Sequence, residues 1–157
     1  MRDIKTERLV LRRETMDDCE MIFKEFHDRP EITRYSNWDP YTSMESTIAK
    51  IARDVEGYET GDFYGWIIEF NGEFAGTIGA YNVEREIKSI ELGYTINPEY
   101  WNLGIGKEAA KAAVDYLMDE KGFNRVHAWT HEDNLPSEKI LKATGMKEEG
   151  VLREVML

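Results

Sequence analysis

Two glycines lie between an alternating apolar stretch and a segment rich in alanine and glutamate. Residues 90–96 alternate apolar side chains with polar ones or glycine, which is typical of a strand. Gly104 and Gly106 precede residues 107–121, whose composition favours a helix. The first N–H groups of a helix have no partner within it and carry the positive end of its dipole. Because glycine permits close backbone approach, this turn is a candidate phosphate-binding loop.

The spacing of residues within this loop can be compared with two familiar phosphate-binding motifs. A Walker loop needs glycine five residues before its Gly-Lys pair and a hydroxyl residue after it, but Trp101 and Glu108 occupy those places. Gly104-x-Gly106-x-x-Ala109 matches a loose dinucleotide fingerprint. However, seven residues separate it from the strand, and it comes late in the chain. The spacing excludes the first motif and disfavours the second.

The stretch resembles the acetyl-CoA loop of the GNAT N-acetyltransferase superfamily, whose motif is Gln/Arg-x-x-Gly-x-Gly/Ala. Both glycines match, and Trp101 stands where Gln or Arg is usual. The sequence ELGY at residues 91–94, followed by NPEYW at 97–101, is more closely similar to the ribosomal-protein N-terminal acetyltransferase group (RimJ/RimL-like). Trp is common at this position in that group.

Four further segments carry the same resemblance. NLPS at residues 134–137 and LKATGMKEEGVLRE at 141–154 resemble the group's closing motif. TERLVLR at 6–12 and WDPY at 38–41 resemble its opening segments. The likeness implies a single N-acetyltransferase domain over residues 1–157. The implied fold class is α/β, the GNAT acyl-CoA N-acyltransferase fold, a mixed, mostly antiparallel sheet flanked by helices on both faces.

The resemblance implies how acetyl-CoA binds as the cosubstrate. Its pantetheine arm is expected to pair with the central strand through backbone groups of Tyr94, Thr95 and Ile96. Its pyrophosphate is expected on the backbone N–H groups of Leu103, Gly104, Ile105, Gly106 and Lys107. Asn134 and Ser137 are further expected cofactor contacts, although Asn134 is equally suited to cap a helix. An ordinary strand-to-helix turn is the alternative for the two glycines.

Acetyl transfer to an amine needs a proton acceptor, a donor for the oxyanion and an acid for the departing thiolate. The family implies direct attack in a ternary complex, with the backbone N–H of Ile96 as the oxyanion donor. Glu91 is the candidate general base, acting through water; the alternative is a solvated strand residue. Many relatives place an acidic Tyr where this chain has Leu141. Ser137 is the candidate replacement, or else a first-turn hydroxyl bonded to its own helix.

An aromatic loop with one carboxylate precedes the second predicted helix. By analogy with the family, acceptor contacts are expected from Tyr35, Trp38, Asp39 and Tyr41. The implied acceptor is a primary amine, such as a protein or peptide N-terminal α-amino group. Aromatic rings with a carboxylate suit a cation, but loop aromatics also serve as ordinary packing residues.

No cluster of metal ligands emerges from the sequence. His27 falls on the first predicted helix, His127 on a strand and His131 near the last helix, where it is expected to border the cleft. No metal is therefore expected. The single cysteine, Cys19, is expected to be a buried thiol in a reducing compartment.

Periodicity and turn residues predict the elements that position these groups. Strands are expected at 7–14, 64–70, 73–83, 86–96, 125–130 and 146–153, with Asn-Gly at 71–72 forming a two-residue hairpin turn. Helices are expected from a Thr15/Asp18 capping box to near Pro30, and over 44–61, 107–121 and 135–144. Relatives usually continue for one more strand, so the domain apparently lacks the family's last strand. The edge at 147–156 is then expected to pair in a homodimer, or to mark a trimmed form.

Charge and composition limit the partners. Thirty-one acidic against twenty basic residues give a net charge of −11, which disfavours nucleic acid and anionic membranes and favours cationic acceptors. No apolar run approaches the ~18 residues of a membrane span. A cytoplasmic enzyme is therefore expected. The alternative is a non-catalytic acyl-CoA-binding sensor or interaction module, because the family's tyrosine is missing at Leu141.

Overall fold

One mixed sheet organises the chain. The computed structural model describes residues 1–35 and 41–153. Among these, strands pair in chain order as β1 (Ile4–Lys5), β2 (Leu9–Arg13), β3 (Tyr64–Phe70), β4 (Glu73–Glu84), β5 (Ser89–Ile96) and β6 (Arg125–His127). The strands from β1 to β5 pair antiparallel with one another, whereas β6 runs parallel to β5. This is the mixed, mostly antiparallel sheet that was expected.

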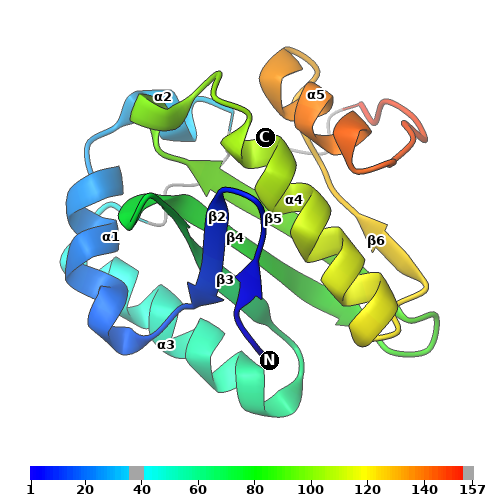
Figure 1. Ribbon diagram of the computed structural model, residues 1–157, viewed down its shortest axis with the longest axis horizontal. Helices are drawn as coiled ribbons and strands as arrows, with labels where there is room; N and C mark the ends of the chain where they lie inside the picture. Colours follow the sequence, from blue (N-terminus) through cyan, green and yellow to red (C-terminus); the bar gives the residue numbers. More distant parts are fainter. Residues whose placement is uncertain (36–40, 154–157) are drawn as a thin grey trace.

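Helices cover both faces of the sheet (Figure 1). α1 (Cys19–Phe26) and α3 (Met44–Thr60) lie against one face, and α4 (Ile105–Asp115) lies against the other. The shorter helical segments are η1 (Met16–Asp18), α2 (Pro30–Thr33), η2 (Pro98–Tyr100), the π-helical η3 (Tyr116–Glu120) and α5 (Leu135–Ala143). The α5 helix lies beside the N-terminal end of α4 (Figure 1).

Two apolar cores hold these layers together. In β3, Trp66 belongs to the core under α4, and its neighbour Ile67 belongs to the core under α1 and α3. Successive strand residues point to opposite faces, so one strand supplies both cores. Both side chains are fully buried. Burial of one large aliphatic side chain stabilises the fold by about 1.5–3 kcal/mol, which fixes the register of β3.

Three local sequence signals are confirmed. Thr15 and Asp18 form the expected capping box, and Gly61 ends α3 with a left-handed φ of 73°. Asn71 and Gly72 have φ values of 54° and 80°, which is the two-residue hairpin turn that Asn-Gly favours. Each of these positions is decided by atoms a few residues apart, which is why the sequence predicts them.

The predicted end of the first helix is wrong. The helix ends at Phe26 rather than near Pro30, because His27 is extended and Asp28 is left-handed with a φ of 56°. Pro30 instead begins the separate helix α2, where its missing N–H costs no helical hydrogen bond. The short strand β1 is an addition that the sequence pattern does not predict.

The last predicted strand is also wrong. Residues 146–153 form no strand, and β6 ends at His127 rather than near residue 130. Much of the segment from 147 to 150 is charged or glycine, which is poor strand composition. Glu149 instead forms an ion pair with Arg125 of β6. The homodimer expected through this edge therefore has no strand to pair through between residues 146 and 153.

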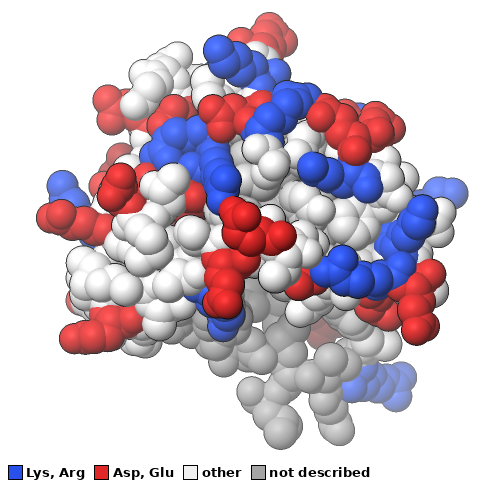
Figure 2. Space-filling model, turned by 90° about the horizontal axis from the view of Figure 1, so that it is seen from below, with Lys and Arg blue, Asp and Glu red and all other residues white. Residues whose placement is uncertain are grey.

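Acidic and basic side chains intermingle on the face seen in Figure 2, and no patch of one sign covers it. Exposed ion pairs such as Arg85–Asp62 join opposite charges at the surface. Within residues 1–35 and 41–153, no helix combines the length and the apolar character of a bilayer span.

One buried carboxyl has an oxygen without the hydrogen bond that usually accompanies burial. Glu14 follows β2 and is 3% exposed, and its Oε1 has no hydrogen-bond partner among the described residues. Burial raises the pKa of Glu14 to about 7; the nearby Lys50 ammonium opposes this shift, and the Asp54 carboxylate adds to it. Lys50 and Asp54 themselves form an ion pair, with 2.6 Å between Nζ and Oδ2. Glu14 is therefore a carboxyl that titrates near neutral pH.

The Glu14 carboxyl should make folding stability depend on pH. Its folded-state pKa of about 7 lies above the ordinary 4.5, so between these values the folded protein binds more protons than the unfolded chain. The free energy of unfolding should then fall as pH rises through this window, by about 3 kcal/mol at ~1.4 kcal/mol per pKa unit. We expect Glu14→Gln to flatten this slope in urea unfolding curves. Glu86→Gln, in the exposed β4–β5 turn, is the control; an unchanged slope in Glu14→Gln would contradict the assignment.

Candidate active site

β5 and β6 separate after a short paired stretch. Their register runs from Ser89 opposite Arg125 to Glu91 opposite His127, and it stops there. Beyond that point β5 continues to Ile96 and pairs with β4 alone among the described strands. One edge of β5 is therefore left open over residues 92–96.

The open edge presents the backbone groups of alternate residues. The N–H of Asn97 donates to Ala75 O on the β4 side at 2.9 Å. Backbone groups alternate between the two sides of a strand, so those of Ile96 and Tyr94 point to the open side. In agreement, Ile96 O accepts from the indole Nε1 of Trp101 at 2.8 Å. The backbone of Thr95 faces β4, so only two of the three residues expected to meet the pantetheine arm face the open edge.

The loop after β5 turns sharply into α4. Asn97 is 1% exposed, and its side chain bonds both the loop and the carboxylate of Glu25, which anchors the start of the loop. Asn102 and Gly104 are both left-handed, with φ values of 63° and 80°, and α4 begins at Ile105. The first-turn N–H groups of α4 lie immediately after these turns, as a diphosphate site requires.

Gly106 sets the distance between α4, α5 and β5. A Cβ at this position would lie 2.7 Å from Ile140 Cδ1 in α5 and 3.3 Å from Ile96 Cγ1 in β5. In a closely packed interior, a larger residue would force the side chains of Ile140 and Ile96 to shift. Glycine thus lets α4, α5 and β5 pack closely at this point.

The side chain of Tyr94 reaches the first turn of α5. Its Oη lies 2.8 Å from Ser137 Oγ and donates to Ser137 O at 3.2 Å. The N–H of Ser137 donates to Asn134 Oδ1, so Asn134 caps α5. Burial raises the pKa of Tyr94 to about 12, and the hydrogen bond to Ser137 opposes that shift. Sequence reasoning gave Tyr94 only a backbone role; its place on the inward face with Ile90 and Leu92 is the signal that could have found it.

Glu91 leaves the opposite face of β5. Residues 91 and 94 are three apart, so their side chains point to different faces. Asn82 Nδ2 donates to Glu91 Oε2 at 2.9 Å, from a left-handed position (φ 53°) where the register of β4 shifts. Tyr81 lies opposite Glu91 and over Gly93, where a Cβ would come within 2.6 Å of its Oη. Sequence reasoning missed both Asn82 and Tyr81, since no short-range pattern marks a β-bulge.

The expected acceptor residues have different surroundings. Trp38 and Asp39 lie outside the described residues. The ring of Tyr35 lies 5.6 Å, between centroids, from the ring of His131, so the end of α2 meets the loop before α5. Tyr41 is 4% exposed and packs against a ring of α1, which is the packing alternative noted for loop aromatics.

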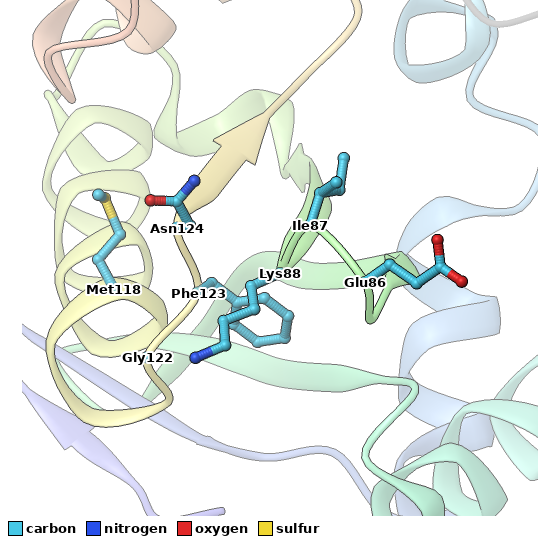
Figure 3. Close-up of a pocket in the computed structure, with 7 residues that line it drawn as sticks. All are labelled: Glu86, Ile87, Lys88, Met118, Gly122, Phe123 and Asn124. Carbon is cyan, nitrogen blue, oxygen red and sulfur yellow. The ribbon is translucent and has the colours of Figure 1, made fainter.

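A shallow hollow lies at the other end of β5 (Figure 3). Its volume is about 540 Å³, and it is lined by residues 86–88, Met118, Gly122, Phe123 and Asn124. It contains none of the expected catalytic groups and lies before β5, whereas the candidate phosphate loop follows β5. Among the described residues, no group of three His, Cys, Asp or Glu side chains is placed to hold a metal ion.

Comparison with known families identifies the class. Residues 8–147 match the acetyltransferase (GNAT) domain family, and the chain belongs to that family. The N-acetyltransferase YoaA of Bacillus subtilis, itself uncharacterized, is 34% identical over 155 residues, which cover 98% of this chain and 87% of that protein. The N-acetyltransferase p20 of Bacillus licheniformis is 28% identical over 156 residues, which cover 98% of this chain and 87% of that protein.

Solved structures share the fold. RimL, a ribosomal L7/L12 α-N-protein acetyltransferase solved with coenzyme A, has a TM-score of 0.87 at 18% identity, over 99% of this chain and 89% of that chain. A GNAT-family acetyltransferase from Bacillus anthracis has a TM-score of 0.80 at 26% identity, over 94% of this chain and 85% of that chain. The protein is accordingly an acetyl-CoA-dependent N-acetyltransferase.

Gly104 and Gly72 allow a matched test of the phosphate loop. Both have a φ of 80°, so alanine at either position should cost about 1 kcal/mol of strain. A Cβ at Gly72 meets nothing within 4 Å, whereas a Cβ at Gly104 lies 3.3 Å from Arg8 Nη2. We expect Gly104→Ala to weaken acetyl-CoA binding about tenfold in calorimetry, and Gly72→Ala to lower only the melting temperature. Equal cofactor affinity in the two folded variants would count against the loop.

Proposed function

We propose that this enzyme acetylates a protein or peptide N-terminal α-amino group by direct attack in a ternary complex. The observation that carries the proposal is the open edge of β5, with Glu91 on one face and the Tyr94–Ser137 pair on the other. A thioester lying along this edge would have a base on one side and a proton donor on the other.

The start of α4 and the open edge together fit the cosubstrate. In the proposal, the N–H groups of residues 103–107 hold its pyrophosphate, and the backbones of Tyr94 and Ile96 pair with its pantetheine arm. Asn134, by capping α5, holds the first turn that carries Ser137. A strand-like ligand added to an unpaired edge is a recurring mode of binding, because the edge supplies ready donors and acceptors.

Each group at the edge has a distinct role in the proposal. The amine nitrogen attacks the thioester carbonyl carbon, and Glu91 takes its proton through a water molecule. The N–H of Ile96 donates to the carbonyl oxygen and stabilises the negative charge that develops there. As the C–S bond breaks, Ser137 Oγ gives a proton to the thiolate and takes one from solvent water in the same step, while Tyr94 Oη orients that hydroxyl from 2.8 Å away.

The names of similar proteins support a protein acceptor. RimL is named for the α-amino group of ribosomal L7/L12, and another similar structure, from Vibrio fischeri, is named a ribosomal-protein-S5-alanine acetyltransferase. Spermidine N(1)-acetyltransferase of Escherichia coli matches only 55% of this chain. A non-catalytic sensor is less favoured, because the Tyr94–Ser137 pair supplies the hydroxyl that Leu141 lacks.

The proposal is tested by an acceptor screen that follows release of the CoA thiol. Peptides with free N-termini, the same peptides with blocked N-termini, polyamines and free amino acids are the acceptors. We expect turnover with the free peptides and none with the blocked ones. Turnover with polyamines alone would refute the acceptor class, and CoA binding without thiol release from any amine would favour the sensor.

Glu91→Gln tests the base. The amide keeps the size of the side chain but cannot take a proton, so we expect kcat to fall by at least about tenfold. The KM for acetyl-CoA should stay within about twofold, because Glu91 is assigned to the acceptor side. Glu73→Gln, an exposed carboxyl at the start of β4, is the control. A threefold or smaller change in kcat would remove Glu91 from the mechanism.

Ser137→Ala tests the proton donor. We expect kcat to fall about tenfold with CoA affinity unchanged, and Ser137→Thr to restore most of the rate because it keeps a hydroxyl. Tyr94→Phe removes the orienting hydroxyl and should lower kcat less than Ser137→Ala does. If Ser137 is only a first-turn hydroxyl of α5, alanine will lower the melting temperature and leave kcat unaltered.

A further inference from the structure

The segment before β2, which is remote in sequence from the candidate phosphate loop, forms hydrogen bonds with the first turn of α4. The carboxylate of Glu108 accepts three hydrogen bonds from two residues that lie just before β2. Thr6 Oγ1 donates to its Oε1 at 2.6 Å, the N–H of Arg8 donates to the same oxygen at 3.0 Å, and Arg8 Nε donates to Oε2 at 2.7 Å. We call these three residues, Thr6, Arg8 and Glu108, the clamp.

The same guanidinium also touches the backbone of the loop. Arg8 Nη1 donates to Leu103 O at 3.0 Å, and Arg8 Nη2 lies 3.3 Å from the place of a Cβ on Gly104. In a trans peptide, the carbonyl of one residue and the N–H of the next point in opposite directions. Because Arg8 holds the carbonyl of Leu103, it turns the N–H of Gly104 away from itself.

The clamp also controls a charge that would oppose an anion. Glu108 lies in the first turn of α4, where a free carboxylate would compete with a phosphate for the positive end of the helix. Burial raises the pKa of Glu108, but the hydrogen bonds from Thr6 and Arg8 outweigh it and hold the pKa below its ordinary value. Glu108 is therefore an ionised group whose charge is matched by Arg8.

We infer that Arg8 is a positioning residue for the phosphate loop: through the clamp and Leu103 O it fixes the backbone whose N–H groups receive the diphosphate of acetyl-CoA. The inference rests on the proposed placement of that diphosphate. Arg8 acts through the loop and from the carbonyl side of it. Two fixed donors are needed at once, one for Glu108 and one for Leu103 O, and a guanidinium supplies them in a rigid fork.

The test compares two ligands that differ in the diphosphate. CoA carries it, whereas pantetheine lacks the whole nucleotide. In Arg8→Ala we expect the dissociation constant of CoA, from calorimetry, to rise about tenfold, as for loss of a hydrogen bond to a charged group. The dissociation constant of pantetheine, from competition against CoA, should stay within about twofold. Binding is measured without an acceptor, so this result stands even if the proposed acceptor class fails.

Further variants separate positioning from other roles. Arg8→Lys keeps the charge but not the fork, so we expect it to resemble Arg8→Ala. Glu108→Gln, which keeps the size of the side chain, should also weaken CoA binding. It takes the place of Arg8→Ala in the test if that variant does not fold. Arg2→Ala, which removes an exposed arginine paired with Glu120, is the matched control.

Three results would overturn the inference. Equal weakening of CoA and pantetheine would mean a general structural defect. Wild-type affinity in Arg8→Lys would mean that charge alone matters, and unchanged CoA affinity in every folded clamp variant would remove the clamp from cofactor binding.

Discussion

The fold depends on the place where β5 and β6 stop pairing. A sheet that continued past Glu91 and His127 would satisfy the edge of β5 with protein groups and leave no room for a ligand. The two strands instead diverge, and α5 packs so closely beside α4 that a side chain on Gly106 would press on Ile140. Unpaired backbone groups must find partners in water or in a ligand. An edge of this kind is therefore costly for a protein that does not use it, and well suited to an extended molecule that carries amides of its own.

The alternation of strand residues divides the proposed chemistry between two faces. Glu91 leaves β5 on one side with Asn82, and Tyr94 leaves it on the other with Ser137. A base and an acid on one side would neutralise each other by direct contact, because a carboxylate within hydrogen-bonding distance would hold the acid's proton. The strand itself separates the two side chains, and Glu91 is the last residue of β5 that pairs with β6. Alternation along β5 thus keeps the two proposed proton-transfer groups apart.

The sequence predicts the parts of the molecule that short-range forces decide. The Asn71–Gly72 turn and the cap at Asn134 both follow from residues within a few positions of one another. The contact between Tyr94 and Ser137 joins residues 43 positions apart, and no local pattern marks it. The failed strand at 146–153 has a different origin, since the charged residues and glycine at 147–150 are themselves poor strand formers.

The candidate phosphate loop shows how long-range contacts stabilise a local strain. Asn102 is a non-glycine residue held at a φ of 63°, which costs free energy unless the surroundings over-determine it. Trp101 bonds back to Ile96 on one side of this turn, and Arg8 bonds Leu103 on the other. A loop held from both sides loses little freedom when an anion binds, so more of the interaction appears as affinity. The segment around Arg8 and the start of α4, about a hundred residues apart in sequence, are therefore held together by direct hydrogen bonds.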